Sequence, residues 1–448
     1  MFEKGANFNT HEDSKEKEIE GKDQNYSTEN ISLESDATVF EVEGINDKQA
    51  QEKSCANILA SYTNKIPEYQ EGDLFKISAA RIIITDLCPY SCTYCGVHYQ
   101  KMLEEGKISQ EDFDRRDIGA NEGGSIRNYR ETKDSYLSPD DYKFLVAVLR
   151  HYFKTMDITL TGGDPFTRPE VKEIIGEIAS LGVKVTTLTK GLPLFSKDGQ
   201  ENISQKAGDA PRIIFSLDTL NEDKHISQNL PLADKDVATG ALAKTLETIK
   251  QACELGYHVD INSVVEPVDY NNEKQAKISF INTKSLVDFA LETKIRKIKF
   301  LELETKNTLG NPYLEDYFNR MKAGGYFASY EISKWISPYV DSERPAIEFC
   351  IIKRKDDAND GLKLYTYRAH CSATALKKDG NRNCDLTGLG ELNINSTGEV
   401  VACQKRPYSN KFDLSPAIHQ RDISGIINCI MAASLEIREQ TCPEERKN

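Results

Sequence analysis

Short apolar runs alternate with longer amphipathic stretches over the middle of the chain. Six of these runs have the length of strands, and the one at residues 81–85 is a β-branched apolar run typical of a buried strand. They cover residues 81–85, 157–161, 183–189, 212–217, 257–265 and 297–303. Helical patterns lie between them, at residues 139–152, 169–181, 237–255 and 283–293. Strands separated by helices predict an α/β fold with a parallel sheet. Because six strands are too few for a closed eight-stranded barrel, we expect a partial (β/α)6 TIM-like barrel.

The pattern changes after this expected barrel. Residues 306–380 are less regular, with a helix expected at 331–336 and a strand at 362–367. A hairpin is expected beyond them, because residues 392–395 and 399–402 are strand-like and Ser396-Thr397-Gly398 between them is typical of a turn. The expected parts are a lead-in segment at 55–77, a core at 78–305, a connecting region at 306–380 and a small C-terminal domain at 381–448.

The beginning of the chain differs in composition from the rest. Residues 1–54 are rich in Glu, Lys, Asp, Asn and Ser, so we expect a disordered acidic tail there. The formal net charge of −14 argues against a nucleic-acid partner. No apolar stretch approaches the roughly 18 residues of a membrane span, and residues 1–20 lack the apolar region of a secretory signal. We therefore expect a cytoplasmic protein with no membrane partner.

Three cysteines follow the first expected strand at close spacing. Cys88, Cys92 and Cys95 form a C-x3-C-x2-C pattern. Thiolates are the usual ligands of iron–sulfur clusters, and three on one loop can hold three irons of a cubane and leave the fourth open. The alternatives are a zinc site with His98 as a further ligand, or three ordinary cysteines. The odd total of 11 cysteines argues against a disulfide framework.

This loop directly after a first strand resembles the radical SAM superfamily, whose enzymes use S-adenosylmethionine (SAM). The resemblance implies that SAM chelates the open iron of a [4Fe–4S] cluster through its amine and carboxylate. An electron from the cluster then cleaves SAM to methionine and a 5′-deoxyadenosyl radical. Tyr94 stands where the superfamily has an aromatic residue that packs near the adenine. Such an enzyme needs an electron donor such as flavodoxin or ferredoxin.

Three more segments at the ends of expected strands support the resemblance. Gly162-Gly163-Asp164-Pro165 resembles the GGEP motif that binds the methionyl amine, and its glycines allow a close backbone approach. Ser216-Leu217-Asp218 resembles the SLD segment, in which the serine contacts SAM. Residues 187–191 resemble the TTNG strand end, with Lys190 in place of Asn. Each alone is also typical of an ordinary turn or cap. Their shared position at the carboxyl ends of strands favours a catalyst.

A second group of cysteines lies near the C-terminus. Cys384, Gly398 and Cys403 form a C-x13-G-x4-C pattern that resembles the SPASM/Twitch extension of radical SAM enzymes. The resemblance implies an auxiliary [4Fe–4S] cluster, for which we assign Cys384, Cys403 and Cys442 as ligands. Cys429, Cys371 and Cys350 are other candidates. Without such a cluster, Cys384 and Cys403 would be ordinary buried thiols.

Within the superfamily, residues 78–305 and 391–403 are most similar to the GTP 3′,8-cyclase group of molybdenum-cofactor biosynthesis. Arg81 matches an arginine that binds GTP in that group, and Thr189 is a further candidate substrate contact. Thr159 and Asp260, however, stand where the group has basic residues for the triphosphate.

We therefore expect a radical SAM enzyme that abstracts hydrogen from a small molecule, nucleotide-like ones included, to drive rearrangement or bond formation. The alternatives are a maturase of a ribosomally synthesised peptide and a non-catalytic cysteine-rich metal-binding scaffold. A metal-binding scaffold would not need the glycine pair or the Ser-Leu-Asp segment at strand ends.

Overall fold

The computed structural model divides the chain into residues 1–47 and a compact unit formed by residues 48–448. The structure describes residues 48–63, 66–69, 74, 76–85, 87–88, 90, 92, 137–191, 212–229, 239–303, 313–335, 346–354, 361–367, 391–401 and 412–439. Most of the expected N-terminal tail lies outside these residues. The first helix, α1 (Lys48–Tyr62), includes the last residues of the segment expected to be a tail.

The strands of the described chain belong to one sheet. The six expected strands are present as β1 (Ala79–Thr85), β2 (Asp157–Gly162), β3 (Lys184–Thr189), β4 (Arg212–Ser216), β5 (His258–Val265) and β6 (Lys297–Glu302). The later strands are β7 (Tyr330–Trp335), β8 (Ala346–Arg354), β9 (Leu362–Tyr367), β10 (Glu391–Ile394), β11 (Glu399–Val401) and β12 (Phe412–Asp413). The prediction of a helix at 331–336 is wrong, because this segment is strand β7, which pairs antiparallel with β8.

The sheet order is β12-β11-β10-β1-β2-β3-β4-β5-β6-β9-β8-β7. Strands β1 to β6 are parallel neighbours in sequence order, which confirms the α/β prediction. Two later strands extend the parallel set, since β10 pairs parallel with β1 and β9 pairs parallel with β6. The expected hairpin is formed by β10 and β11, and it joins the edge of the same sheet.

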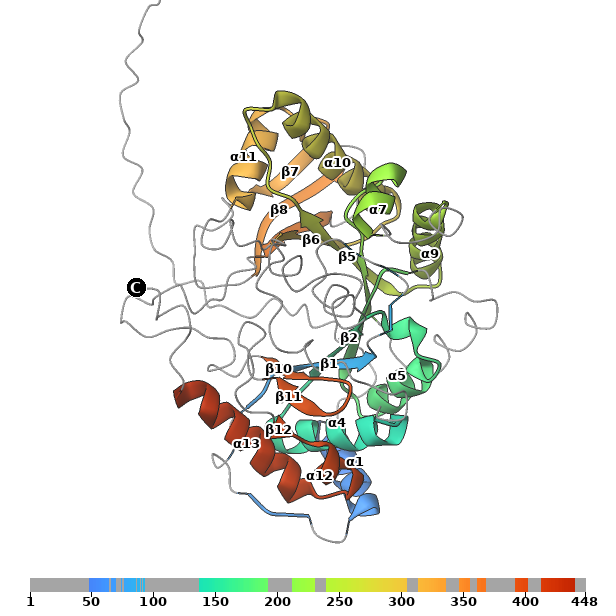
Figure 1. Ribbon diagram of the computed structural model, residues 1–448, viewed down its shortest axis with the longest axis vertical. Coiled ribbons are helices and arrows are strands. Elements are labelled where there is room, and N and C mark those ends of the chain that lie inside the picture. The colour runs from blue at the N-terminus through green and yellow to red at the C-terminus, as the bar shows by residue number, and fades with distance from the viewer. Residues whose placement is uncertain are drawn as a thin grey trace, which may run out of the picture. The chain divides into compact units, whose positions relative to one another are not determined.

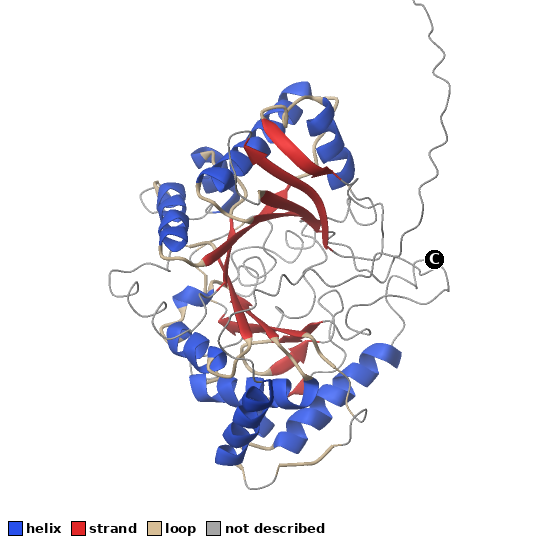
Figure 2. Cartoon of the chain, turned by 180° about the vertical axis from the view of Figure 1, so that it is seen from behind, coloured by secondary structure: helices blue, strands red, loops and turns tan. Residues whose placement is uncertain are grey.

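Helices cover one face of this sheet, on its convex side (Figure 2). After α1, the helices of the described residues are α4 (Pro139–Phe153), α5 (Val171–Ala179), α7 (Glu222–Asn229), α9 (Ala241–Glu254), α10 (Glu273–Glu292), α11 (Leu314–Ala323), α12 (Ser415–His419) and α13 (Ile423–Glu439), and the 3-10 turn η3 (Pro165–Thr167) precedes α5. Figure 1 shows α1, α4, α12 and α13 together beside β10 to β12, and α10 and α11 near β7 and β8. None of the helices in the described part of the chain is long and apolar enough to cross a membrane.

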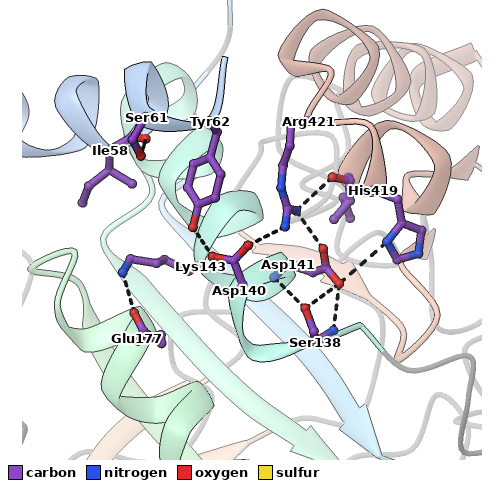
Figure 3. Close-up of polar contacts among 11 residues, drawn as sticks. Ile58, Ser61, Tyr62, Ser138, Asp140, Asp141, Lys143, Glu177, His419 and Arg421 are labelled. Atoms are coloured by element: carbon purple, nitrogen blue, oxygen red, sulfur yellow. Dashed lines mark hydrogen bonds and ion pairs between the residues drawn. The ribbon is translucent and has the colours of Figure 1, made fainter.

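Local chemistry explains where α4 begins. Ser138 is its N-cap, Pro139 is the first helical residue, and Ser138 and Asp141 form a reciprocal capping box. Asp141 is also bound by Arg421, whose guanidinium reaches from the turn between α12 and α13 to both Asp140 and Asp141 (Figure 3). Tyr62 of α1 donates to Asp140. We call Tyr62, Asp140, Asp141 and Arg421 the Arg421 cluster; it ties α1, α4 and the C-terminal helices together.

The core lies between the helices and the sheet, in two hydrophobic clusters. One packs β1 to β3 and β10 against α1, α4, α5, α12 and α13. The other packs β4 to β6, β8 and β9 against α9, α10 and α11. The buried strand positions alternate, as in Ala80, Ile82 and Ile84 of β1. The alternate positions, such as Arg81, therefore face the concave side of the sheet, away from these helices.

Candidate active site at the carboxyl ends of the strands

The cysteine loop begins immediately beyond the carboxyl end of β1. Cys88 is exposed, and Cys92 is buried with an exposed fraction of 5%. Cys95 and Tyr94 lie outside the described residues. Among the residues that the structure does describe, no three His, Cys, Asp or Glu side chains form a metal site. The assignment of a cluster to Cys88, Cys92 and Cys95 therefore stays a prediction.

The glycine pair is held against this loop by backbone hydrogen bonds. The amide of Gly163 donates to the carbonyl of Thr85 at 2.8 Å, and the amide of Asp164 donates to the carbonyl of Leu87 at 2.8 Å. Gly162 has φ +145°, and a Cβ atom there would lie 2.0 Å from the Thr85 carbonyl oxygen. Only glycine permits this approach. The Gly162–Gly163 turn therefore lies directly beside the chain that leads into Cys88.

Asp164 fastens this turn to the end of β3. Its carboxylate accepts from the Thr189 hydroxyl at 3.0 and 2.9 Å, from the Lys190 amide at 3.0 Å and from the Phe166 amide at 3.1 Å. Burial raises the pKa of Asp164 to about 6, although these hydrogen bonds and the Lys190 charge oppose the rise. The two side chains predicted to contact SAM and substrate, Asp164 and Thr189, thus bind each other, and their roles toward ligands stay predictions.

Lys190 occupies the centre of the site, where the TTNG pattern has Asn. Its ammonium group donates to the Asn229 side-chain oxygen at 2.8 Å and pairs with Asp218 at 3.4 Å. It also lies 5.6 Å from the centre of the Tyr90 ring. Asp218 in turn accepts from the Val264 amide at 2.8 Å, so β3, β4 and β5 meet here. The substitution of Asn by Lys was visible in the sequence, but its partners were not.

Sequence reasoning missed the contribution of α7. Asn229, the last residue of this helix, is fully buried and accepts from the Cys92 thiol at 3.4 Å. Its side-chain nitrogen lies 3.4 Å from Nδ1 of His225. Two buried atoms of α7, Nε2 of His225 and Oε1 of Gln228, lack a hydrogen-bond partner among the described residues. No motif marks these residues, because a short polar helix after a strand is common.

This donor set fits the group that the cysteine pattern implies. Cys88 and Cys92 could ligate iron, and Cys92 lies among polar side chains that can bind a thiolate. Ser216 ends β4 on the concave face, opposite Asn262 of β5, and could contact SAM. The unpartnered atoms of His225 and Gln228 leave hydrogen-bonding capacity for a polar ligand.

A second group of charged side chains lies deeper on the concave face. Register aligns Arg81 with Thr159, Thr186 and Arg212 across β1 to β4, and places Lys297 and Lys299 of β6 on the same face. We call Arg81, Arg212, Lys297 and Lys299 the inner cation group.

Asp260 is the carboxylate that forms an ion pair with Arg212 in this group. Lys297 lies 4.0 Å from the centre of the Tyr365 ring. Burial and the charges of Lys297, Arg81 and Arg212 lower the pKa of Lys299 to about 8, although Asp260 opposes this. The like charges on this face therefore add to the effect of burial on Lys299. Sequence reasoning identified Arg81 and missed the other three.

The expected auxiliary ligands Cys384, Cys403 and Cys442 lie outside the described residues. Two of the other candidates are described: Cys350 is buried in β8, and Cys429 is half-buried in α13. Burial raises the pKa of the Cys350 thiol to about 12 and that of Cys429 to about 11.

Comparisons with known proteins show what the chain is similar to. A family model of the radical SAM superfamily matches residues 82–278. The GTP 3′,8-cyclase of Campylobacter fetus is 30% identical over 229 residues, which cover 50% of this chain and 55% of that protein. The GTP 3′,8-cyclase of Mannheimia succiniciproducens is 21% identical over 344 residues, which cover 76% of this chain and 81% of that protein.

A further relative and a solved structure complete the comparison. The GTP 3′,8-cyclase of Marinobacter nauticus is 25% identical, over 49% of this chain and 59% of that protein. The chain thus spans little more than half the length of the Marinobacter and Campylobacter enzymes. Streptococcus suis SuiB bound to its precursor peptide SuiA aligns over 82% of this chain and 68% of SuiB, with 14% identity and a TM-score of 0.48. The residues that match the radical SAM superfamily model include the cysteine loop, the glycine turn and Lys190, so this part of the chain is similar to that superfamily.

Proposed function

We propose that this protein holds a [4Fe–4S] cluster on Cys88, Cys92 and Cys95, cleaves SAM reductively, and abstracts hydrogen from a small anionic molecule. The observation that carries the proposal is the pair of backbone hydrogen bonds that fix the Gly162–Gly163 turn to Thr85 and Leu87. They bring a backbone that can approach a ligand closely to the start of the cysteine loop. An ordinary strand-to-helix turn would not need these two hydrogen bonds.

When bound, the cluster and SAM would supply a 5′-deoxyadenosyl radical that removes a hydrogen atom from the substrate. The residues of the chain would bind SAM and the substrate and orient them. The Gly162–Gly163 turn and Ser216 would hold the methionyl part of SAM, and Asp164 keeps that turn fixed to β3. The buried side chains of Lys190, Asp218 and Asn229 restrict water near Cys92.

We extend the proposal to an auxiliary [4Fe–4S] cluster on Cys384, Cys403 and Cys442, and to reduction by a flavodoxin or ferredoxin. The cysteine spacing supports the auxiliary cluster. The cluster would bind the substrate or accept an electron from it. Changing Cys403 to Ala should then lower the iron content by about four per chain, since a cubane holds four irons.

The inner cation group supports an anionic substrate. Four cations from three strands gather on the concave face of a chain whose formal net charge is −14. Phosphate and carboxylate groups are the partners that arginine and lysine bind most strongly. Although Thr159 and Asp260 replace two basic residues of the GTP 3′,8-cyclase group, Lys297, Lys299 and Arg212 place positive charge on neighbouring strands. A nucleoside triphosphate such as GTP is therefore the first substrate to test.

The cluster is tested by anaerobic reconstitution with iron and sulfide, followed by measurement of 5′-deoxyadenosine from SAM under dithionite. Wild-type protein should make 5′-deoxyadenosine, and Cys92→Ala should abolish it. Cys253→Ala is the matched control, because Cys253 lies in α9 outside the site and should leave cleavage unchanged. Cleavage by the Cys92 variant, or bound zinc without cleavage in the wild type, would overturn the cluster assignment.

The substrate class is tested by titrating GTP and inorganic triphosphate into the reconstituted protein. We expect binding that weakens at high salt, and at least a tenfold loss of affinity in Lys299→Met. If the variant and the wild type bind both probes with equal affinity, the inner cation group is not the binding site of the phosphates. A protein that binds neither probe, but whose SAM cleavage is stimulated by a peptide, would favour the maturase alternative.

A further inference from the structure

Asn229 of α7 makes a direct contact with the second cysteine of the loop. The Cys92 thiol donates to Oδ1 of Asn229 at 3.4 Å. Asn229 is completely buried and Cys92 is 5% exposed, so water does not compete for this contact. The two residues come from segments 137 positions apart in the sequence. The last residue of a helix beyond β4 thus lies against the sulfur that the proposed function assigns to iron.

Asn229 is itself held by a buried cation. Lys190 donates to the same oxygen at 2.8 Å and pairs with Asp218 at 3.4 Å. The side chains of Lys190 and Asp218 are 12% and 3% exposed. The Tyr90 hydroxyl donates to the backbone carbonyl of Lys190 at 3.2 Å, and the Tyr90 ring lies beneath the ammonium. These contacts fix a positive charge beside the Cys92–Asn229 pair.

Ligation of iron would change the hydrogen bonding at this pair. A cysteine ligand is a thiolate, which has no proton to donate and can only accept. The Asn229 oxygen cannot stay against such a sulfur, but a half-turn of the amide presents its nitrogen, a donor, to the same place. In the structure, Nδ1 of His225 lies 3.4 Å from the amide nitrogen of Asn229. After the rotation, the amide oxygen faces this Nδ1 atom instead. Lys190 keeps Asp218 as its partner and can turn toward the sulfur.

His225 is suited to accept this rotation of the Asn229 amide. Burial and the Lys190 charge lower the pKa of His225 to about 4, while Asp218 opposes this. The ring is therefore neutral at pH 7 and carries one N–H, which can be placed on Nδ1 to donate to the turned amide. The alternative, a purely structural bond between the loop and α7, needs neither the lysine nor the histidine.

We propose that Asn229 donates an amide hydrogen bond to the Cys92 sulfur of the iron-loaded protein, and that Asn229 and Lys190 together make the cluster easier to reduce. The inference rests on the proposed function, because it requires iron at Cys92. Hydrogen bonds to cluster sulfurs and nearby charge set the potentials of such clusters. A donor and a cation both stabilise the more negative, reduced state. Asn229 and Lys190 act through Cys92 and are positioning residues.

The test is a redox titration of the reconstituted cluster, followed by EPR in the absence of SAM. Asn229→Leu removes the amide at similar volume, and Lys190→Met removes the charge and keeps the stem. Each should load the wild-type amount of iron and shift the midpoint to a more negative potential. A tenfold change in the reduction equilibrium corresponds to about 59 mV for one electron. Lys224→Met, on the exposed side of α7, is the control and should leave the potential unchanged.

Asn229→Gln keeps an amide donor, so its midpoint potential should lie between those of Asn229→Leu and the wild type. A merely structural role would not predict this intermediate potential. A wild-type potential in iron-loaded Asn229→Leu or Lys190→Met overturns the proposal. Loss of iron from both variants also overturns it, because the pair would then only support the loop. Failure of the proposed function is distinct: the wild type itself would bind no four-iron cluster, or would bind one and not cleave SAM. In the latter case the titration still decides the role of Asn229.

Discussion

The Arg421 cluster and the inner cation group use positive charge in opposite ways. Arg421 reaches two carboxylates, Asp140 and Asp141, and its guanidinium also lies 5.1 Å from the ring centres of Tyr62 and Phe144. In the inner cation group, burial and the charges of Lys297, Arg81 and Arg212 lower the pKa of Lys299. In the Arg421 cluster one cation pairs with two carboxylates, whereas the inner cation group brings four cations onto one face beside Asp260.

This difference separates a structural contact from a binding site. Balanced charge in the Arg421 cluster stabilises the folded protein without any ligand. On the concave face, burial and neighbouring positive charge disfavour the protonated form of Lys299, and a bound anion would favour it. Removing a cation should therefore destabilise the first group, and should relieve the second while weakening its ligand.

The largest effect is expected at Arg421. Arg421→Met should lower the free energy of unfolding by about 3 kcal/mol, because it leaves Asp141 buried without its cation. Chemical denaturation measures this loss. Arg320→Met removes an exposed pair with Asp316 and should change little. A loss no greater than that of the control would show that the Arg421 cluster does not stabilise the fold.

The same cluster predicts a dependence on acid. Although burial acts to raise it, hydrogen bonds from Ser138 and from Arg421 hold the pKa of Asp141 below its ordinary value. A lowered carboxyl pKa contributes stability above the ordinary value, about 4, and this stability is lost as the pH falls through the folded pKa. The gap in unfolding free energy between wild type and Arg421→Met should therefore narrow below pH 4. A constant gap down to pH 2 would contradict this linkage.

An intermediate effect is expected at Lys299, with the opposite sign. Its pKa of about 8 lies below the ordinary 10.5, so between these values the unfolded chain binds the proton more tightly. Wild-type stability should rise with pH over this window by about 2 to 3 kcal/mol from this residue, since each unit of pKa shift corresponds to about 1.4 kcal/mol. Denaturation of Lys299→Met at pH 7 to 10.5 should lack this rise and show higher stability at pH 7. A variant that is less stable at pH 7 would show that Lys299 stabilises the fold.

The smallest effect is expected at Arg212. Its side chain is 43% exposed and pairs with Asp260, so Arg212→Gln should change the unfolding free energy by less than about 1 kcal/mol. A double-mutant cycle with Asp260→Asn isolates the pair. Binding of inorganic triphosphate should nevertheless weaken in the single variant. A large coupling energy would show that Arg212, like Arg421, stabilises the fold. The inner cation group would then not differ from the Arg421 cluster in this respect.

Local patterns were enough to predict much of the sheet. Strands β1 to β6 carry apolar residues at their buried positions, as in β1 and β6. The start of α4 is marked by three neighbouring side chains, Ser138, Pro139 and Asp141. Residues 331–336 were misassigned because their polar composition favours neither state strongly. Pairing with β8 makes them a strand, and that pairing is tertiary. The parallel pairings of β9 and β10 with distant strands have no local signal either.

The sequence by itself determined the cysteine pattern, the glycine turn and the alternation of strands β1 to β6 with helices, because each depends on neighbouring residues or on backbone geometry. Only the tertiary structure decided what surrounds them. Asn229 contacts Cys92, Lys190 pairs with Asp218, and the Arg212 side chain pairs with Asp260 of the neighbouring strand. Charge and hydrogen bonding act over a few ångströms in space, whereas these residues are separated by tens to hundreds of positions along the chain.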